Sequence, residues 1–281
     1  MVASQCAHAK QIGSGQLFPF LSIAFGLAWS LFALFLFATD WVVGTFGELS
    51  GSHPLFILAV YSPAIAALIL VGYSAGLAGI GKFLKRLFLW RASPWWYGFL
   101  VIGFPFISFT GAVLKGNAMS APIFTESFST LMPAIGFMLI LGPMEEIGWR
   151  GFALPILQRH LVPFQAGLVV GLIWAVWHLP AFMLSGTPQA AWGFMPFLAG
   201  SVACSVILTA FFNNGGGSIF LAMLFHFQMN NPLWPDAQPY DMYLYVVAAV
   251  VITWLNRHSL FSKSISVTEV IPASNRSGLA P

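Results

Sequence analysis

Charged residues are scarce in this sequence. Only 8 Asp and Glu and 11 Lys and Arg occur among 281 residues, a charged share of 7%, whereas a soluble domain carries about 25%. Hydrophobic residues make up 58% of the chain and aromatic residues 16%. A chain with so little charge cannot cover a water-exposed surface, so the composition excludes a soluble globular domain and indicates an integral membrane protein.

Cysteine is almost absent. Cys6 lies in a polar N-terminal stretch and Cys204 lies inside an apolar run, a pattern of neither a disulfide framework nor a cysteine metal cluster. The net charge of +3 is small. Its basic residues lie in loops beside apolar runs, where they act as topology signals, so a nucleic-acid partner is disfavoured.

Long apolar runs predict an all-α polytopic membrane protein with about eight transmembrane helices. The first run exceeds the about 7–15 apolar residues of a signal peptide, so we expect a retained helix. The expected organisation is a polar tail at 1–16, one transmembrane domain at 17–257 and a flexible tail at 258–281. The expected spans are Leu17–Ala38, Leu55–Ile80, Trp95–Leu114, a fourth from Leu131 to Arg159 that Pro143 kinks or divides, Phe164–Leu184, Trp192–Phe212, Ser218–Met229 and Tyr240–Leu255.

Basic residues predict the orientation of these spans. Eight spans place both termini on one side, which carries nine of the basic residues, whereas the opposite loops carry only Lys115. By the positive-inside rule both termini are cytoplasmic, in the bacterial cell membrane or, in a eukaryote, in the endoplasmic reticulum. The nine are Lys10, Lys82, Lys85, Arg86, Arg91, Arg159, Arg257, Lys263 and Arg276.

One basic stretch has a pattern of its own. The bases of 82–91 alternate with apolar residues in a way that fits a short helix lying in the headgroup plane, with a plain basic loop as the alternative.

Few ionisable residues lie within the spans, and three of them share a depth. Glu145 lies 14 positions before Arg159, and His178 lies 14 positions after Phe164, each about 21 Å along a helix axis. His226 lies nine positions after Gly217, or about 14 Å. Because charge in a bilayer is costly, such a coincidence indicates a site.

Helical spacing then orients these residues. Glu146 and Arg150 are four apart with the acid first, which favours an intrahelical ion pair. We therefore expect Glu146 to be held by Arg150 and Glu145 to face His178 and His226. By the same spacing, Trp174 shares a face with His178, and Asn230 with His226.

Each residue also has a purely structural interpretation. Glu146 and Arg150 can form a packing clip between helices, and Asn230 can end a short helix before Pro232. An intramembrane His can simply hydrogen-bond a carbonyl, and Trp174 can be packing or pocket lining. The shared depth of Glu145, His178 and His226 favours function for those three.

A carboxylate, two imidazoles and a carboxamide in a dry cavity suit hydrolysis. The carboxylate serves as a general base for water, and His and Asn donate to a developing oxyanion. Glu145, His178 and His226 also resemble a His₂Glu zinc site, so a divalent metal such as zinc stays open, although this mechanism requires no cofactor. No H-E-x-x-H pair and no Ser or Cys in a nucleophile elbow is present.

Three motifs within 131–231 carry a family resemblance. Glu145 to Arg150 resembles the E-E-x-x-x-R motif of the CPBP family, the CAAX proteases and bacteriocin-processing enzymes, also called Abi or type II CAAX prenyl endopeptidases. Trp174 to His178 resembles its F-x-x-x-H motif, with Trp in place of Phe, and His226 to Asn230 matches H-x-x-x-N. The trio occurs in the family's order.

The resemblance implies an eight-helix intramembrane endopeptidase, glutamate-dependent or metal-dependent. It implies that Glu145 and His178 activate water and that His226 and Asn230 hold the oxyanion, with Glu146 and Arg150 in support. The expected partners are the lipid bilayer and a membrane-associated protein or peptide, prenylated or not.

Two other functions stay open. In a non-catalytic scaffold or immunity protein the polar cluster would join helices. A proton-coupled transporter would spread its polar residues through the full depth of the membrane.

Overall fold

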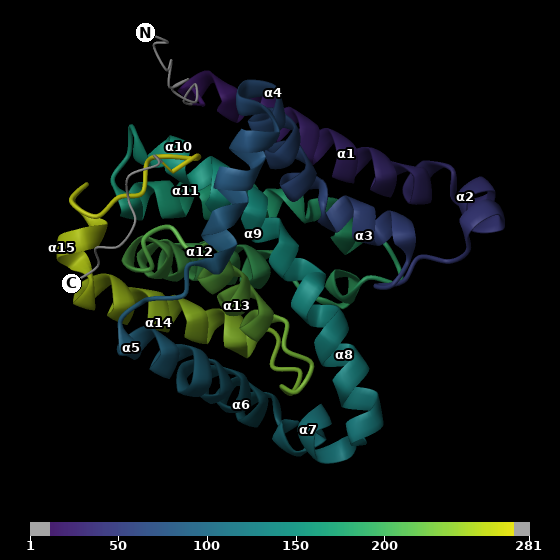
Figure 1. Ribbon diagram of the computed structural model, residues 1–281. Helices are drawn as coiled ribbons and strands as arrows, with labels where there is room; N and C mark the ends of the chain where they lie inside the picture. The colour runs from purple at the N-terminus through teal and green to yellow at the C-terminus, as the bar shows by residue number, and fades with distance from the viewer. Residues whose placement is uncertain (1–11, 273–281) are drawn as a thin grey trace, which may run out of the picture.

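The computed structural model describes residues 12–272, which form helices with no β-strand among them. Figure 1 shows them gathered in one bundle, with α2 at one end of α1 and α15 on the opposite side. The helices are α1 (Leu17–Phe37), α2 (Thr39–Phe46), α3 (Pro54–Val60), α4 (Ser62–Leu84), α5 (Pro94–Gly98), α6 (Phe104–Lys115), α7 (Pro122–Thr125), α8 (Phe128–Ile140), α9 (Glu145–Gly148), α10 (Leu154–Gln158), α11 (Pro163–Trp177), α12 (Phe194–Asn214), α13 (Ile219–Met229), α14 (Tyr240–Leu255) and α15 (Arg257–Leu260).

Among the described residues, six helical stretches are long and apolar enough to cross a membrane, and α13 and α14 are shorter apolar helices. The predicted all-α polytopic membrane protein is therefore confirmed. The second predicted run divides at Tyr61, since Pro63 lies in the first turn of a new helix. The six stretches are Ser14–Phe37, Ser62–Phe88, Pro94–Lys115, Phe128–Gln158, Pro163–Met183 and Phe194–Asn214.

The fourth span is interrupted, as its proline predicts. Helix α8 ends at Ile140, a 3₁₀ turn follows over Gly142–Met144, and α9 starts at Glu145. Pro143 has no N–H to continue the hydrogen-bond ladder. The freed carbonyl of Ile140 accepts a hydrogen bond of 2.8 Å from Tyr61 Oη. The interruption thus starts a new helical turn at the two adjacent glutamates.

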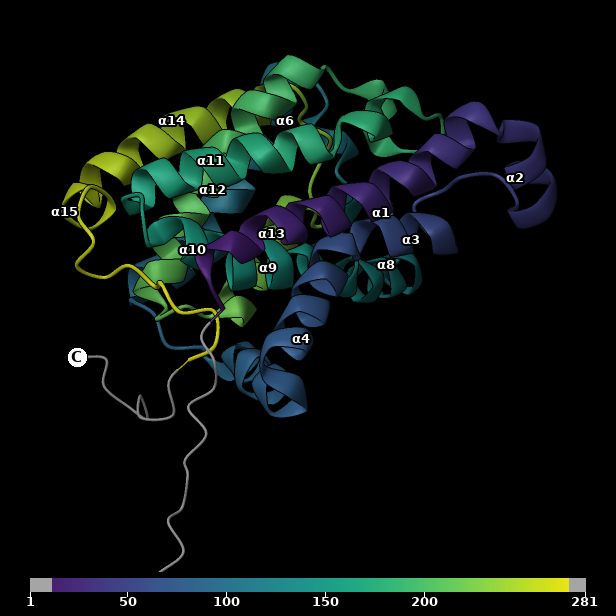
Figure 2. The same cartoon turned by 90° about the horizontal axis from the view of Figure 1, so that it is seen from above.

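Helix α12 packs against both α11 and α14, and Figure 1 shows it between them. Figure 2 shows α1 crossing the bundle above α9 and α13. Glycines on α11 allow its close approach to α12. A Cβ at Gly167 would lie 2.9 Å from Thr209 Oγ1, and one at Gly171 would lie 2.7 Å from the Cα of Val202. Without hydrophobic driving force in lipid, such close backbone packing is a main source of helix association.

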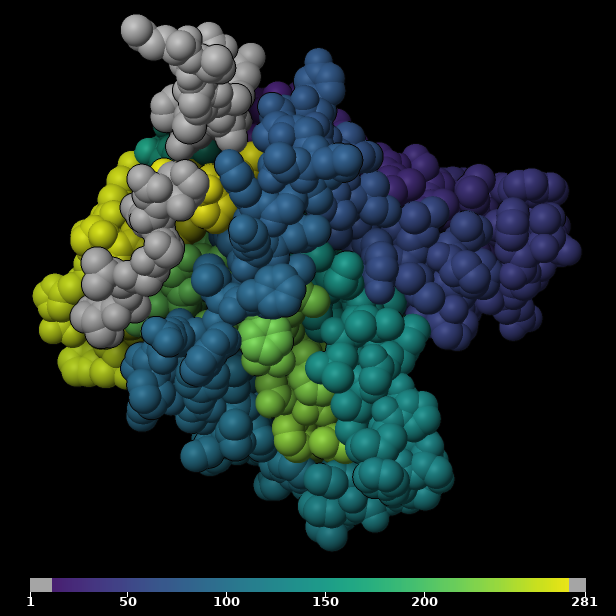
Figure 3. Space-filling model, viewed as in Figure 1, coloured from purple at the N-terminus to yellow at the C-terminus, as the bar shows by residue number. Residues whose placement is uncertain are grey.

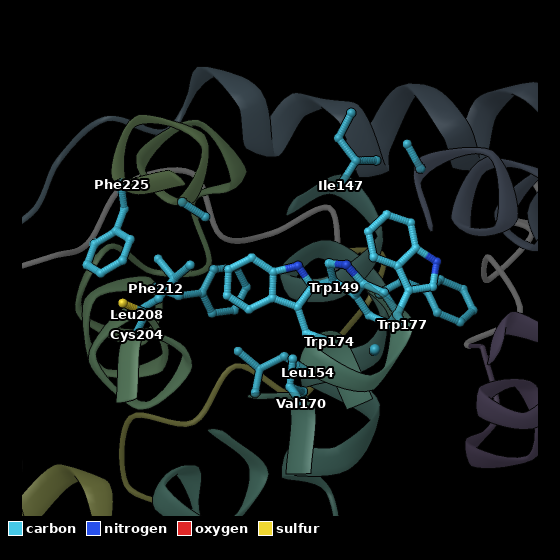
Figure 4. Close-up of a cluster of buried hydrophobic side chains, with 14 of the residues drawn as sticks. Ile147, Trp149, Leu154, Val170, Trp174, Trp177, Cys204, Leu208, Phe212 and Phe225 are labelled. Atoms are coloured by element: carbon cyan, nitrogen blue, oxygen red, sulfur yellow. The ribbon is translucent and has the colours of Figure 1, made fainter. Parts of the chain in front are cut away.

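Aromatic side chains fill the space around the fourth and fifth spans. Figure 4 shows Trp149, Trp174 and Trp177 in one buried cluster. Trp149 meets Trp177 edge to face at 6.0 Å, and Phe20 meets Trp149 in the same way at 5.5 Å. These rings fix how the fourth span rotates against the fifth.

The stretch 82–91 is helical up to Phe88 and not helical from Leu89 to Arg91. Helix α4 kinks at Gly76 and ends at Leu84, a 3₁₀ turn follows over Lys85–Phe88, and Arg86 is buried. Its guanidinium donates to the carbonyls of Gly217 and Gly151, both at 2.8 Å, and to Val270 at 3.2 Å. Backbone carbonyls from three distant segments thus hold the charge inside the protein.

The ends of the chain differ from the expected tails where they are described. Residues 1–11 and 273–281 lie outside the described residues. Within 258–272, where we expected a flexible tail, Leu260 and Val270 are buried. The Nε2 of Gln158 donates to the carbonyl of Val267 at 2.9 Å, and Arg159 donates to that of Thr268 at 2.9 Å. The segment is held because it supplies acceptors to buried donors.

Candidate active site

The predicted polar residues come from the fourth, fifth and seventh spans. Glu145 and Glu146 begin α9, His178 directly follows α11, and His226 lies on α13. Asn230 directly follows α13 and is exposed. Glu146 and Arg150 are completely buried, and Glu145 and His226 are each 3% exposed. The cluster therefore runs from the protein interior to the surface at Asn230.

Glu146 is the centre of a buried charge network. Its carboxylate lies 3.1 Å from Nη1 of Arg150, which confirms the predicted ion pair. The same carboxylate accepts a hydrogen bond of 2.7 Å from Nδ1 of His226. The expectation that Arg150 leaves Glu146 turned away from the histidines is therefore wrong. A carboxylate has about four acceptor sites, so one arginine does not saturate it.

Glu145 has a different partner. Its Oε2 accepts a hydrogen bond of 2.7 Å from the indole Nε1 of Trp174. Within the described part of the chain, Glu145 forms no hydrogen bond to His178 or His226. Sequence reasoning missed the indole donor, although the Trp that replaces the Phe of the motif was the signal. Phe has no polar atom and cannot make this bond.

His178 is held by its own helix. Its Nδ1 lies 2.8 Å from the carbonyl oxygen of Trp174, which only accepts, so Nδ1 carries the proton. In the neutral ring Nε2 is then an acceptor. The rings of Trp177 and Phe197 meet the imidazole edge to face at 4.7 and 5.2 Å. The imidazole is thereby fixed with a proton-accepting nitrogen left over.

Two nitrogen atoms converge on a glycine that the sequence did not single out. A Cβ on Gly142 would lie 2.6 Å from Nδ2 of Asn230 and 2.8 Å from Nε2 of His226. Only a residue without a Cβ fits there, since real contacts of this kind are longer. Gly142 starts the 3₁₀ turn before Glu145, so the break in the fourth span opens room for both side chains.

Trp174 contacts Arg150, His178 and His226 in addition to Glu145. Its ring lies 5.2 Å from Cζ of Arg150, within cation–π range. The same ring meets His178 at 5.5 Å and His226 at 5.4 Å. Together with the hydrogen bond to Glu145, these contacts place the indole between side chains of the fourth, fifth and seventh spans.

The site lies beside a surface-exposed edge of α13. Figure 3 shows the α13 region, in green, at the surface between α8 and α6. Phe220 on this helix is 38% exposed. Helix α13 therefore combines a buried face, which carries His226, with a face that reaches the lipid.

The three candidate metal ligands do not form a metal site as the structure places them. Among the described residues, no group of three His, Cys, Asp or Glu side chains is arranged to hold a metal ion. The Nδ1 atoms of His178 and His226 are hydrogen-bonded to Trp174 and Glu146, which leaves the Nε2 atom of each ring. Because Glu145, His178 and His226 do not form a ligand group of this kind, we derive no step through a metal.

The fold and the cluster define a class: a polytopic helical membrane protein in which a carboxylate and two imidazoles from three spans gather around Trp174. Residues 127–231 match the model of the type II CAAX prenyl endopeptidase Rce1-like family. The resemblance to the CPBP family that the three motifs indicated is thereby confirmed, and it rests on these residues.

A curated relative matches part of the chain. CAAX prenyl protease 2 of Methanococcus maripaludis is 32% identical over 111 residues, which are 37% of this chain and 41% of the relative. The chain thus aligns with less than half of that relative's length.

Proposed function

We propose that this protein is an intramembrane endopeptidase that hydrolyses a peptide bond in a membrane-associated protein or peptide. One observation carries the proposal. Glu145 and His178 are both hydrogen-bonded to Trp174, while Nε2 of His226 and Nδ2 of Asn230 both lie close to Gly142. To catalyse amide hydrolysis, a protein must supply a base that activates water and donors that stabilise the oxyanion.

Glu145 and His178 act on the water in this proposal. The Oε2 of Glu145 is held by Trp174, which leaves Oε1 to accept a proton from the attacking water. The Nε2 of His178 accepts the second hydrogen bond of that water, because Nδ1 carries the ring proton. The oxygen of the water then adds to the carbonyl carbon, and Glu145 returns the proton to the leaving amine as the C–N bond breaks.

His226 and Asn230 stabilise the oxyanion. The amide Nδ2 of Asn230 is a donor at all pH values. The Nε2 of His226 donates when the ring is an imidazolium, and Glu146 at 2.7 Å from Nδ1 stabilises that charge. Arg150 on the same carboxylate fixes its orientation. Glu146 and Arg150 thus support the site without touching the substrate.

The substrate class follows from the setting. The site is buried between spans, so a substrate reaches it from the bilayer, and a prenylated C-terminal segment is one such substrate. With both termini cytoplasmic, as the basic residues predict, such a segment would approach from the cytoplasmic leaflet. The lipid bilayer and the substrate are then the partners of the protein.

A non-catalytic scaffold or immunity protein is the second candidate. It is favoured by the complete burial of Glu146 and Arg150, since a buried ion pair can serve to fix helix register alone. In this case the cluster joins helices and no peptide is cleaved.

Cleavage of defined peptides tests the choice between the two. The full chain, reconstituted in liposomes, is offered a farnesylated peptide and the same peptide without the lipid, and products are identified by mass spectrometry. We expect new termini with wild type and about 100-fold to 1,000-fold slower cleavage with Asn230→Ala, the loss typical of one oxyanion donor. Absence of products from both peptides and from total membrane peptides, with a folded protein, would favour the scaffold.

A further inference from the structure

A long apolar groove lies on the membrane-facing side of α11, α12 and α14, away from the glutamates and histidines. Its volume is about 730 Å³. Helix α12 lies between α11 and α14, and Figure 2 shows α15 at one end of α14. Phe164 of α11, Val202 and Val206 of α12, and Val250 of α14 line it. None of its lining residues belongs to the candidate active site.

The groove spans most of one leaflet. Along α14 it extends from Val246 to Trp254, about 12 Å at the rise of an α-helix, and Arg257, the first residue of α15, follows at that end. The hydrocarbon core of a bilayer is about 30 Å thick, so one leaflet contributes about 15 Å. Most of an extended acyl chain of one leaflet therefore fits along α14, with Arg257 beyond its end.

A single charged residue stands at one end of this groove. Arg257 is the only charged lining residue, and it is exposed. Its Nη1 donates to the carbonyl of Trp254 at 2.9 Å, and its Cζ lies 5.3 Å from the centre of the Trp254 ring. Within residues 12–272 no acidic side chain forms an ion pair with it. Trp and Arg at the end of an apolar helix are typical of the headgroup level.

We propose that this groove binds an anionic glycerophospholipid, with one acyl chain between α11, α12 and α14 and the phosphate on Arg257. The apolar lining fits the chain, and the unpaired guanidinium complements the negative headgroup. The proposal does not depend on peptidase activity, because both the groove and the cation lie outside the candidate active site.

The molecule supplies its own control groove. A smaller groove of about 220 Å³ lies between α6 and α14 and is lined only by apolar residues, among them Phe106, Val247 and Ala248. It has no cation at either end, so it predicts no preference for anionic lipid. Ala248 faces it from α14, the helix that also lines the larger groove.

Native mass spectrometry of the full chain tests the proposal. The protein is purified from nanodiscs that contain phosphatidylglycerol and phosphatidylcholine with identical acyl chains, and the retained lipids are counted. Wild type is expected to retain more phosphatidylglycerol than phosphatidylcholine. In Arg257→Gln the ratio of the two retained lipids is expected to fall about fivefold, the effect of one basic residue at an anionic surface. Arg91→Gln is the matched control, because Arg91 also stacks on an exposed tryptophan, Trp90, outside the groove.

A second pair of variants fills the grooves. Ala199→Trp places an indole in the larger groove and is expected to remove retained lipid of both kinds, whereas Ala248→Trp in the smaller one leaves the phosphatidylglycerol unchanged. An undiminished preference in Arg257→Gln would overturn the proposal. So would displacement of phosphatidylglycerol by a farnesylated peptide, which assigns the groove to substrate, or a dimer that Ala199→Trp abolishes, which assigns it to a second copy.

Discussion

Nδ1 of His226 lies 2.7 Å from the carboxylate of Glu146, and this contact separates the tasks of the two adjacent glutamates. Glu146 is enclosed by two cationic or proton-donating partners, Arg150 and His226. Glu145 meets a neutral indole and keeps one oxygen free of protein hydrogen bonds. The contacts of Glu146 suit an anion that supports the site, and those of Glu145 suit a general base.

Replacing each glutamate by glutamine is expected to affect different properties. Glu146→Gln leaves the buried guanidinium of Arg150 without a countercharge, which costs about 3–5 kcal/mol of folding stability. Glu145→Gln removes no ion pair and is expected to leave the unfolding temperature within a few degrees of wild type. Thermal unfolding in the same detergent compares the two. Equal losses of stability would contradict the division of tasks.

Trp174 is expected to position the carboxylate of Glu145. Trp174→Phe removes the N–H donor at 2.7 Å, and the loss of one hydrogen bond to a charged group corresponds to a roughly tenfold or greater fall in kcat. KM is expected to stay unchanged, because the indole does not hold the substrate in this account. Steady-state kinetics on the cleaved peptide measures both constants.

Trp96→Phe is the matched control for that measurement, because Trp177, the other indole of the motif, contacts His178. The indole of Trp96 is buried and stacks on Phe211 away from the site. Trp96→Phe is expected to lower stability and to leave kcat unchanged. A fall in kcat of the same size in both variants would mean that aromatic packing, and not the hydrogen bond to Glu145, sets the rate.

Gly142 is expected to admit no side chain. In Gly142→Ala the new Cβ would lie 2.6 Å from Nδ2 of Asn230 and 2.8 Å from Nε2 of His226, so both nitrogen atoms must move. Activity is expected to fall about 100-fold to 1,000-fold, as when an oxyanion donor is lost. Gly136→Ala in α8 serves as the control, because a Cβ there meets nothing within 4 Å. Full activity of Gly142→Ala would place the oxyanion elsewhere.

Arg86 is expected to hold the C-terminal segment against the bundle. Arg86→Gln removes donors to Gly151, Gly217 and Val270, and hydrogen bonds from a charged group contribute about 1.5–3 kcal/mol each. We expect a lower unfolding temperature and faster tryptic cleavage at Lys263. Lys85→Gln, which changes the exposed neighbouring base, is expected to alter neither. Unchanged proteolysis in Arg86→Gln would show that the segment is held by its other contacts.

The sequence was sufficient for the features that depend on apolar runs and helical spacing. The eight runs are largely helical because lipid leaves a chain few alternatives to a helix, although the second divides at Tyr61 and the fourth at Gly142–Met144. The spacing of four predicted the Glu146 to Arg150 pair correctly. Similar depth along three spans also identified the elements that bring Glu145, His178 and His226 to one region of the bundle.

Other features depend on three-dimensional packing that spacing does not encode. The rotation of α9 follows from the turn at Gly142–Met144, so the second partner of Glu146 was not predictable from a regular helix. The stretch around Arg86 has the pattern of an interfacial helix, yet its guanidinium lies inside because Gly151, Gly217 and Val270 present carbonyls there. A pattern along one chain does not reveal acceptors that come from distant segments.

The cleavage rate of Glu145→Gln per folded molecule tests the central claim most directly. The variant and wild type are reconstituted in the same liposomes with the same peptide, and Glu126→Gln, a change in an exposed loop, controls for the loss of one carboxylate. The account predicts that Glu145→Gln cleaves about 100-fold to 10,000-fold more slowly, the contribution of a general base, while Glu126→Gln cleaves as wild type. Cleavage by folded Glu145→Gln at the wild-type rate would contradict it.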